Sequence, residues 1–180
     1  MAEPKEFISP RELLRESFAL AGKVYDSGYR PDLLLAVWRG GTPIGIAVHE
    51  FLLYKGLNTA HAVVKVESYR GIGVRGEPEV DRVETILDKV APHTKVLIVD
   101  DIFDSGNTLA KLHGLLAEKG DEVRTATLYY KPSRNVTGLV PDFFVRETEA
   151  WVVFPHELAG LSMEEIREKD DYIHDLLAGT

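Results

Sequence analysis

Hydrophobic and polar positions follow two different periods along this chain, and together they predict an α/β protein. Short runs of consecutive apolar residues, typical of strands buried on both faces, alternate with longer segments in which apolar residues return every three or four positions. The expected strands cover residues 32–37, 59–66, 96–99, 123–130, 143–145 and 151–154. Because most of them are separated by helical segments, we expect a mainly parallel, doubly wound sheet flanked by helices.

The helical segments carry recognisable start and stop signals. Ser9, Pro10 and Glu12 have the spacing of a capping box with proline at the first helical position. Glycines follow the apolar faces at positions where helices commonly end. The expected helices run from about 10 to Gly28, from about 44 to Gly56, from about 109 to Gly120, and over 162–177.

Two segments show neither period clearly. Residues 67–79 are rich in glycine and polar side chains and lack an apolar face, so we interpret them as a mobile loop. Residues 80–90 fit a strand or a short helix equally well. A length of 180 residues predicts one domain, with a core over about 30–135.

Composition and charge narrow the functional classes. The chain is 44% hydrophobic and 28% charged, and it has no cysteine, so disulfides and thiolate metal sites are excluded. A net charge of −8 argues against general nucleic-acid binding and favours a metal-complexed form of any anionic substrate. No membrane-length apolar run or signal peptide is visible, so we expect a cytoplasmic enzyme without nucleic-acid or membrane partners.

The most informative chemistry lies between the apolar run 96–99 and the following helix. Asp100 and Asp101 come directly after the run, and a Ser-Gly-Asn-Thr turn opens the helix. Backbone N–H groups at a helix start bind phosphate, and paired carboxylates bind sugar hydroxyls or hydrated Mg²⁺. These features favour a ribose phosphate, although an ordinary strand-to-helix loop with solvated acids would read similarly.

Other residues point to the same edge of the predicted sheet. Arg39, Gly40 and Gly41 follow the first buried strand, where glycines allow close approach of an anion and arginine adds charge; a helix-entry turn is the alternative. A 6-oxopurine needs a hydrogen-bond donor and a stacking surface, which Lys131 and Trp151 would supply. Considered alone, Lys131 is more simply interpreted as a surface lysine and Trp151 as a core tryptophan.

Residues 96–109 resemble the phosphoribosyl-pyrophosphate (PRPP) signature of type I phosphoribosyltransferases: an apolar strand, two acids, two further residues, an acid, a small turn and threonine. The resemblance implies that Asp100 and Asp101 hold the ribose and that Asp104 also faces the imidazole ring of a purine. It places around the 5-phosphate Asp104, Ser105, Gly106, Asn107 and Thr108. Asn107 stands where many members have a basic residue.

The remaining motifs follow in the same family order. Arg39 and Gly40 resemble the pyrophosphate loop, and Ser68-Tyr69 resembles the pair on the lid that closes over PRPP. The base pocket would be formed by Lys131, Trp151 and Val152, beneath a hood built from the N-terminal segment and residues 140–160. Glu157 would join Asp100 and Asp101 near Mg²⁺.

The resemblance is to the hypoxanthine-, xanthine- and guanine-using members. It implies Mg²⁺-dependent transfer of phosphoribosyl from PRPP to a 6-oxopurine in purine salvage, giving a nucleoside monophosphate and pyrophosphate. It also implies a homodimer or higher homo-oligomer, with the terminal helix either capping the domain or joining the dimer. The alternatives are a transferase for adenine, uracil or orotate, and a non-catalytic PRPP or nucleotide sensor.

Overall fold

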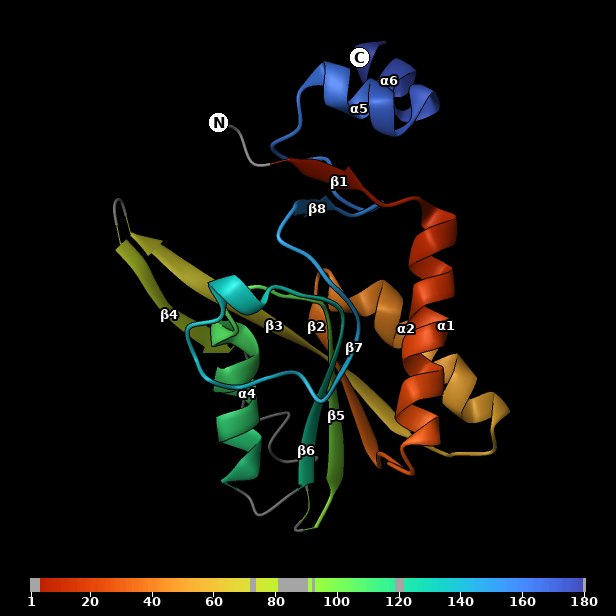
Figure 1. Cartoon of the computed structure of the whole chain (residues 1–180), viewed down its shortest axis with the longest axis vertical. Coiled ribbons are helices and arrows are strands. Elements are labelled where there is room, and N and C mark those ends of the chain that lie inside the picture. The colour runs from red at the N-terminus through yellow and green to blue at the C-terminus, as the bar shows by residue number, and fades with distance from the viewer. Residues whose placement is uncertain (1–3, 72–73, 81–90, 92, 119–121, 180) are drawn as a thin grey trace. The chain divides into compact units, whose positions relative to one another are not determined.

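The computed structural model describes residues 4–71, 74–80, 91, 93–118 and 122–179 (Figure 1). The chain divides into two compact units, which are described separately below. The larger unit is residues 14–149, and the smaller unit combines residues 1–13 with 150–180. No helix within the described ranges has the length and apolar character needed to cross a membrane.

A six-stranded sheet forms the centre of the larger unit. Its order is β4-β3-β2-β5-β6-β7, and every neighbouring pair is parallel except β3 and β4. The strands are β2 (Leu33–Trp38), β3 (Ala60–Gly71), β4 (Val74–Val80), β5 (Lys95–Phe103), β6 (Glu122–Tyr130) and β7 (Phe143–Glu147). The expected mainly parallel α/β fold is confirmed, and β3 and β5 run longer than the apolar runs that predicted them.

Helices cover both faces of this sheet, with α4 (Asn107–Ala117) on one side and α2 (Gly41–Tyr54) on the other (Figure 1). Alternate side chains of β2 face the two layers. Leu33, Leu35 and Val37 join the apolar cluster that includes Leu109 and Leu112 of α4. On the opposite face, a β-carbon at Gly45 of α2 would stand 2.8 Å from that of Ala36, so helix and strand are in close contact there.

Helix α1 (Pro10–Asp26) begins and ends at the predicted signals. The Ser9 backbone N–H donates to the Glu12 carboxylate at 2.9 Å, and the Glu12 N–H donates to the Ser9 hydroxyl at 3.2 Å. This is the reciprocal pair of a capping box. Gly28 follows the helix with φ of +81°, a conformation that glycine adopts without steric cost.

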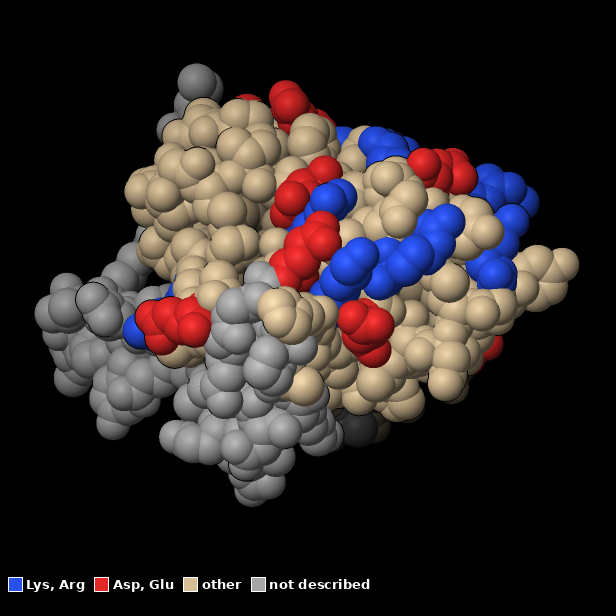
Figure 2. Space-filling view, turned by 90° about the horizontal axis from the view of Figure 1, so that it is seen from below, with Lys and Arg blue, Asp and Glu red and all other residues tan. Residues whose placement is uncertain are grey.

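Polar groups fasten the edge of the sheet at which β5 and β6 begin. The buried Tyr29 hydroxyl lies 2.9 Å from the carbonyl oxygens of both Val96 and Glu122. Burial, reinforced by the Glu122 charge, raises the pKa of Tyr29, so its hydroxyl stays protonated. Arg124 pairs with Glu122 at 2.9 Å. Figure 2 shows how basic and acidic side chains adjoin one another on the face that it views.

The smaller unit contains a two-stranded parallel sheet and two helices. Strand β1 (Lys5–Phe7) pairs with β8 (Trp151–Val153), and α5 (Met163–Lys169) is followed by α6 (Asp171–Ala178). The prediction of one helix over 162–177 is therefore wrong. Asp170 is extended, at φ −167° and ψ 113°, and its carboxylate accepts from the Ile173 N–H, so it ends one helix and caps the next.

The interpretation of residues 67–79 as a loop is also wrong at the level of the backbone. Strand β3 continues to Gly71 and pairs antiparallel with β4, with a register shift between Ser68 and Arg70. Pro78 is compatible with a strand here because β4 is an edge strand, where a ladder donor can be missing. The ambiguous segment beyond β4, residues 81–90, lies outside the described residues.

Candidate functional site

Three predicted motifs of the larger unit meet at one edge of its sheet. The Arg39-Gly40-Gly41 loop follows β2, Asp100 and Asp101 lie near the end of β5, and Lys131 follows β6. These three strands are parallel neighbours, β2 beside β5 and β5 beside β6. Their carboxyl ends therefore converge, which is where open α/β sheets bind ligands.

The loop after β2 packs directly on the acid pair. A β-carbon built at Gly40 would stand 1.8 Å from Asp101 Oδ2, and one at Gly41 would stand 2.2 Å from the Val99 carbonyl oxygen. A side chain at Gly41 would collide with the β5 backbone, and one at Gly40 would collide with the Asp101 carboxylate, so glycine allows this close packing. The peptide between Trp38 and Arg39 is cis, and the Arg39 side chain is exposed to solvent. The loop after β2 and the acid pair are therefore in direct contact.

The electrostatics of Asp100 fit a site that receives a cation. Burial, and then the negative charge of Asp101, raise the pKa of Asp100 well above its usual range. Backbone N–H groups of Asp101 and Gly41 oppose this shift by donating to the carboxylate, the first at 2.9 Å. A cation between the two carboxylates would stabilise their ionised forms.

The carboxylates of Asp100 and Asp101 suit a Mg²⁺ ion whose other ligands are water and substrate. Among the described residues, no group of three or more His, Cys, Asp or Glu side chains is placed to hold a metal. Mg²⁺ commonly binds through one or two carboxylates, completing its octahedron with water and substrate phosphates. Asp100 and Asp101 therefore fit a metal that arrives with a phosphorylated substrate.

The turn after β5 has the features of a phosphate site. Gly106 precedes α4 with φ of +84°, and as a glycine it has no side chain that could cap the helix. Its first-turn N–H groups, from Asn107 and Thr108 onward, lie at the positive end of the helix dipole. The Asn107 N–H is 3.5 Å from the Ser105 hydroxyl, at the limit of a hydrogen bond.

A segment that the sequence did not single out lies beside this turn. The 3₁₀ turn η1 (Pro132–Arg134) follows Lys131, and Arg134 Nε is 2.8 Å from Asp104 Oδ1. The Lys131 N–H donates to the Phe103 carbonyl at 2.9 Å, which places the buried Lys131 at the same edge. The only sequence signal for Arg134 was a basic residue three positions after Lys131.

The remaining predicted site residues belong to β3 and to the smaller unit. Ser68 and Tyr69 are part of β3, and their side chains lie outside the described set. Trp151 and Val152 are in β8 of the smaller unit, where Trp151 is half exposed and Val152 is buried. Glu157 belongs to the same unit, and its carboxylate accepts from the Phe154 N–H at 3.1 Å.

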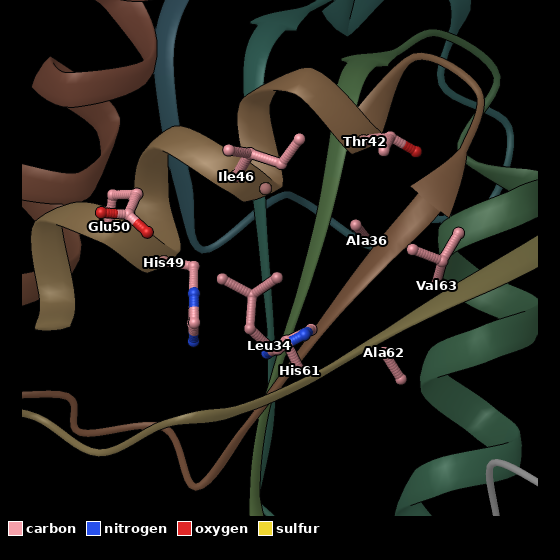
Figure 3. Close-up of a pocket in the computed structure, with 10 residues that line it drawn as sticks. Leu34, Ala36, Thr42, Ile46, His49, Glu50, His61, Ala62 and Val63 are labelled. Atoms are coloured by element: carbon pink, nitrogen blue, oxygen red, sulfur yellow. The ribbon is translucent and has the colours of Figure 1, made fainter.

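A separate pocket of about 130 Å³ lies between α2 and β3, with mostly apolar side chains around it (Figure 3). His49 and His61 meet there with ring centroids 4.7 Å apart, and His49 Nε2 is 2.9 Å from the Thr59 carbonyl oxygen. Glu50 is the pocket's single carboxylate. The residues that line this pocket include no carboxylate pair, so the converging strand ends are the stronger candidate.

Comparisons with known proteins agree with this choice. The profile of the phosphoribosyl transferase domain family matches residues 9–161. A hypoxanthine-guanine phosphoribosyltransferase of Lactococcus lactis is 29% identical over 141 residues, covering 77% of this chain and 74% of the relative. A xanthine-guanine phosphoribosyltransferase of a Ruegeria species is 29% identical over 179 residues, covering 91% of each.

Solved structures give the same result. The crystal structure of a purine phosphoribosyltransferase from Pyrococcus horikoshii superposes with a TM-score of 0.71 at 28% identity. The match covers 88% of this chain and 97% of that structure.

Proposed function

Because this chain belongs to the phosphoribosyl transferase domain family, whose profile spans most of its length, we propose that it is a 6-oxopurine phosphoribosyltransferase. In the proposed reaction, PRPP and hypoxanthine, guanine or xanthine give a nucleoside monophosphate and pyrophosphate. The purine relatives named above support this substrate class.

The observation that carries the proposal is the packing of Gly40 against Asp101. A glycine-rich anion loop, a carboxylate pair and a helix start preceded by Gly106 occur where the parallel strands of the sheet end. PRPP presents three matching groups: a pyrophosphate, a ribose with two hydroxyls, and a 5-phosphate. The loop, the acid pair and the turn would bind them in that order.

The chemistry requires little more than binding and charge placement. The bond from ribose C1′ to the pyrophosphate oxygen breaks, and a bond from C1′ to a purine nitrogen forms. Positive charge develops on the ribose, close to the carboxylates of Asp100 and Asp101. Arg39 would bind the departing pyrophosphate, and Asp104 would accept a proton from the imidazole ring.

Asp100 and Asp101 would hold Mg²⁺, with Glu157 as a further predicted ligand, and the ion when bound neutralises charge on the pyrophosphate. The purine would be recognised by Lys131, Trp151 and the Val152 backbone. Lys131 would donate to the 6-oxo group and Trp151 would stack on the ring. Ser68 and Tyr69 would cover the bound PRPP and exclude water.

The decisive experiment is a coupled assay of pyrophosphate release with Mg²⁺ and PRPP. The base panel is hypoxanthine, guanine, xanthine, adenine, uracil and orotate. We expect turnover with at least one 6-oxopurine and none with uracil or orotate. Turnover restricted to adenine, uracil or orotate would overturn the substrate class. Absence of turnover with all six bases, together with PRPP binding by calorimetry, would indicate a sensor.

We further propose that the chain self-associates, at least as a homodimer, and acts in the cytoplasm. Light scattering of the purified chain across a concentration series tests the first point. A molar mass equal to one chain at all concentrations would contradict it.

A further inference from the structure

The ion pair between Asp104 and Arg134 joins two connections that follow neighbouring strands. Asp104 comes directly after β5, and Arg134 ends the η1 turn after β6. Arg134 Nε lies 2.8 Å from Asp104 Oδ1, and the two side chains are 36% and 41% exposed. An ion pair this exposed contributes little to stability in general, so its presence calls for another explanation.

Backbone hydrogen bonds before and after Arg134 connect its segment to residues 103–105, at the end of β5 and in the turn that follows. Before it, the Lys131 N–H donates to the Phe103 carbonyl oxygen at 2.9 Å. After it, the Val136 N–H donates to the Ser105 carbonyl oxygen at 3.1 Å. The backbone of Arg134 is therefore held beside the Phe103–Ser105 segment. Forming the contact with Asp104 then costs less conformational entropy than it would from a mobile backbone.

The contact constrains one carboxylate oxygen of Asp104. A carboxylate that acts on a substrate proton must have the correct orientation as well as the correct charge. Because guanidinium is permanently charged and less strongly hydrated than an ammonium group, it is better suited to a lasting contact with a buried carboxylate oxygen. Asp104 Oδ1 is buried and accepts no hydrogen bond from the described residues, so the Arg134 charge at 2.8 Å is what holds this oxygen in place relative to the turn.

We propose that Arg134 is the positioning residue for Asp104: it orients the carboxylate that faces the purine imidazole ring. This inference rests on the proposed function and adds to it a residue outside the family-like motifs. It also explains why η1 is fastened to the turn from both sides.

The test uses the full chain and steady-state kinetics with PRPP and whichever base the wild-type protein accepts. We expect Arg134→Gln to lower kcat by about tenfold to a hundredfold, with the KM for PRPP changed by less than about threefold. Arg134→Lys keeps the charge without the planar fork, so it should recover part of the loss. In the double variant with Asp104→Asn, the second change should cost almost nothing, since both act through one carboxylate.

Arg124→Gln is a matched control. Arg124 pairs with Glu122 at 2.9 Å, with side-chain exposures of 35% and 44%, at the opposite edge of the same sheet. We expect that variant to keep the wild-type kcat. Urea unfolding of all variants separates loss of fold from loss of orientation.

Three results would overturn the inference. A wild-type kcat in Arg134→Gln would do so, as would fully additive losses in the double variant. A raised KM for PRPP at unchanged kcat would instead identify Arg134 as a phosphate ligand. Each of these three results requires an active wild-type chain. If the wild-type protein turns over no base, the proposed function fails, and this inference fails with it.

Discussion

Gly40 lies so close to Asp101 that the smallest possible side chain would overlap the carboxylate, at 1.8 Å from Oδ2. We predict that Gly40→Ala lowers kcat/KM for PRPP by at least about tenfold, because the loop or the carboxylate must move. Gly22→Ala is the control, since a β-carbon there meets no atom within 4 Å. Equal activity of the two variants in the pyrophosphate assay would show that the close contact is irrelevant to catalysis.

The carboxylate pair supports a second prediction. Asp100→Asn combined with Asp101→Asn should lower kcat by about a hundredfold or more, since both charges facing the ribose are removed. The far-ultraviolet circular dichroism spectrum should remain that of the wild-type protein. Asp142→Asn serves as a control, because Asp142 is an exposed carboxylate that binds Thr125, near the start of β6. Unchanged turnover in the double variant would remove the assigned role.

A third prediction concerns the pH dependence of stability. Burial and the Asp101 charge raise the folded-state pKa of Asp100, so the folded protein holds a proton that the unfolded chain has lost. Stability should therefore fall as pH rises from the ordinary carboxyl pKa of 3.8 through the raised value. Asp100→Asn removes this cost.

The measurement is urea unfolding of the wild-type protein and Asp100→Asn at pH 5 and pH 8 without divalent ions. We expect the variant's stability advantage, measured as the difference in free energy of unfolding, to be larger at pH 8 than at pH 5. Mg²⁺ should narrow the gap by stabilising the ionised pair. A gap that is independent of pH would contradict the assigned electrostatics.

Substitutions at Gly106 and Gly138 distinguish two causes of lost stability, steric overlap of an added side chain and strain of a positive φ. Both have positive φ, +84° and +74°. A β-carbon at Gly106 would meet the Phe103 ring at 2.5 Å, whereas one at Gly138 meets nothing within 4 Å. We predict that Gly138→Ala costs about 1 kcal/mol and Gly106→Ala costs about 1–2 kcal/mol more, measured by urea unfolding. The reverse order would show that the turn relaxes around the added carbon.

Base recognition can be tested at Lys131, which is only 2% exposed. Lys131→Met should raise the KM for the 6-oxopurine by about tenfold while leaving the KM for PRPP nearly unchanged, because one hydrogen bond to the base is lost. Lys95→Met, at the start of β5, is the control and should change neither KM. Equal rises in both constants for Lys131→Met would point to general damage at the site.

The central part of this site was predictable because its residues are adjacent in the sequence. The junction from Val96 to Leu109 combines a buried strand, an acid pair and a helix start within one short stretch, so local patterns contain nearly all the information. The loop at Arg39 was equally local. Its contact with Asp101 follows from parallel pairing of β2 and β5, which the alternation of strands and helices anticipated.

Long-range and irregular features were less accessible. Strand β1 has three residues, too few to show a period, and pairs with β8 near the other end of the chain. Arg134 acquires its contact only because η1 folds back over the turn. Asp170 was hidden inside an amphipathic stretch, although aspartate is a favoured helix cap. The β3–β4 pairing was not predicted, because the glycines and polar residues of 67–79 are typical of a loop.

The bonds of Tyr29 have a practical implication. Its hydroxyl joins β5 and β6 where these strands begin, while Asp100 lies towards the other end of β5. The Tyr29 hydrogen bonds and the proposed PRPP site thus lie at opposite ends of the same strands. Substitutions around Tyr29 that raise thermal stability could therefore be made without changing the residues around Asp100.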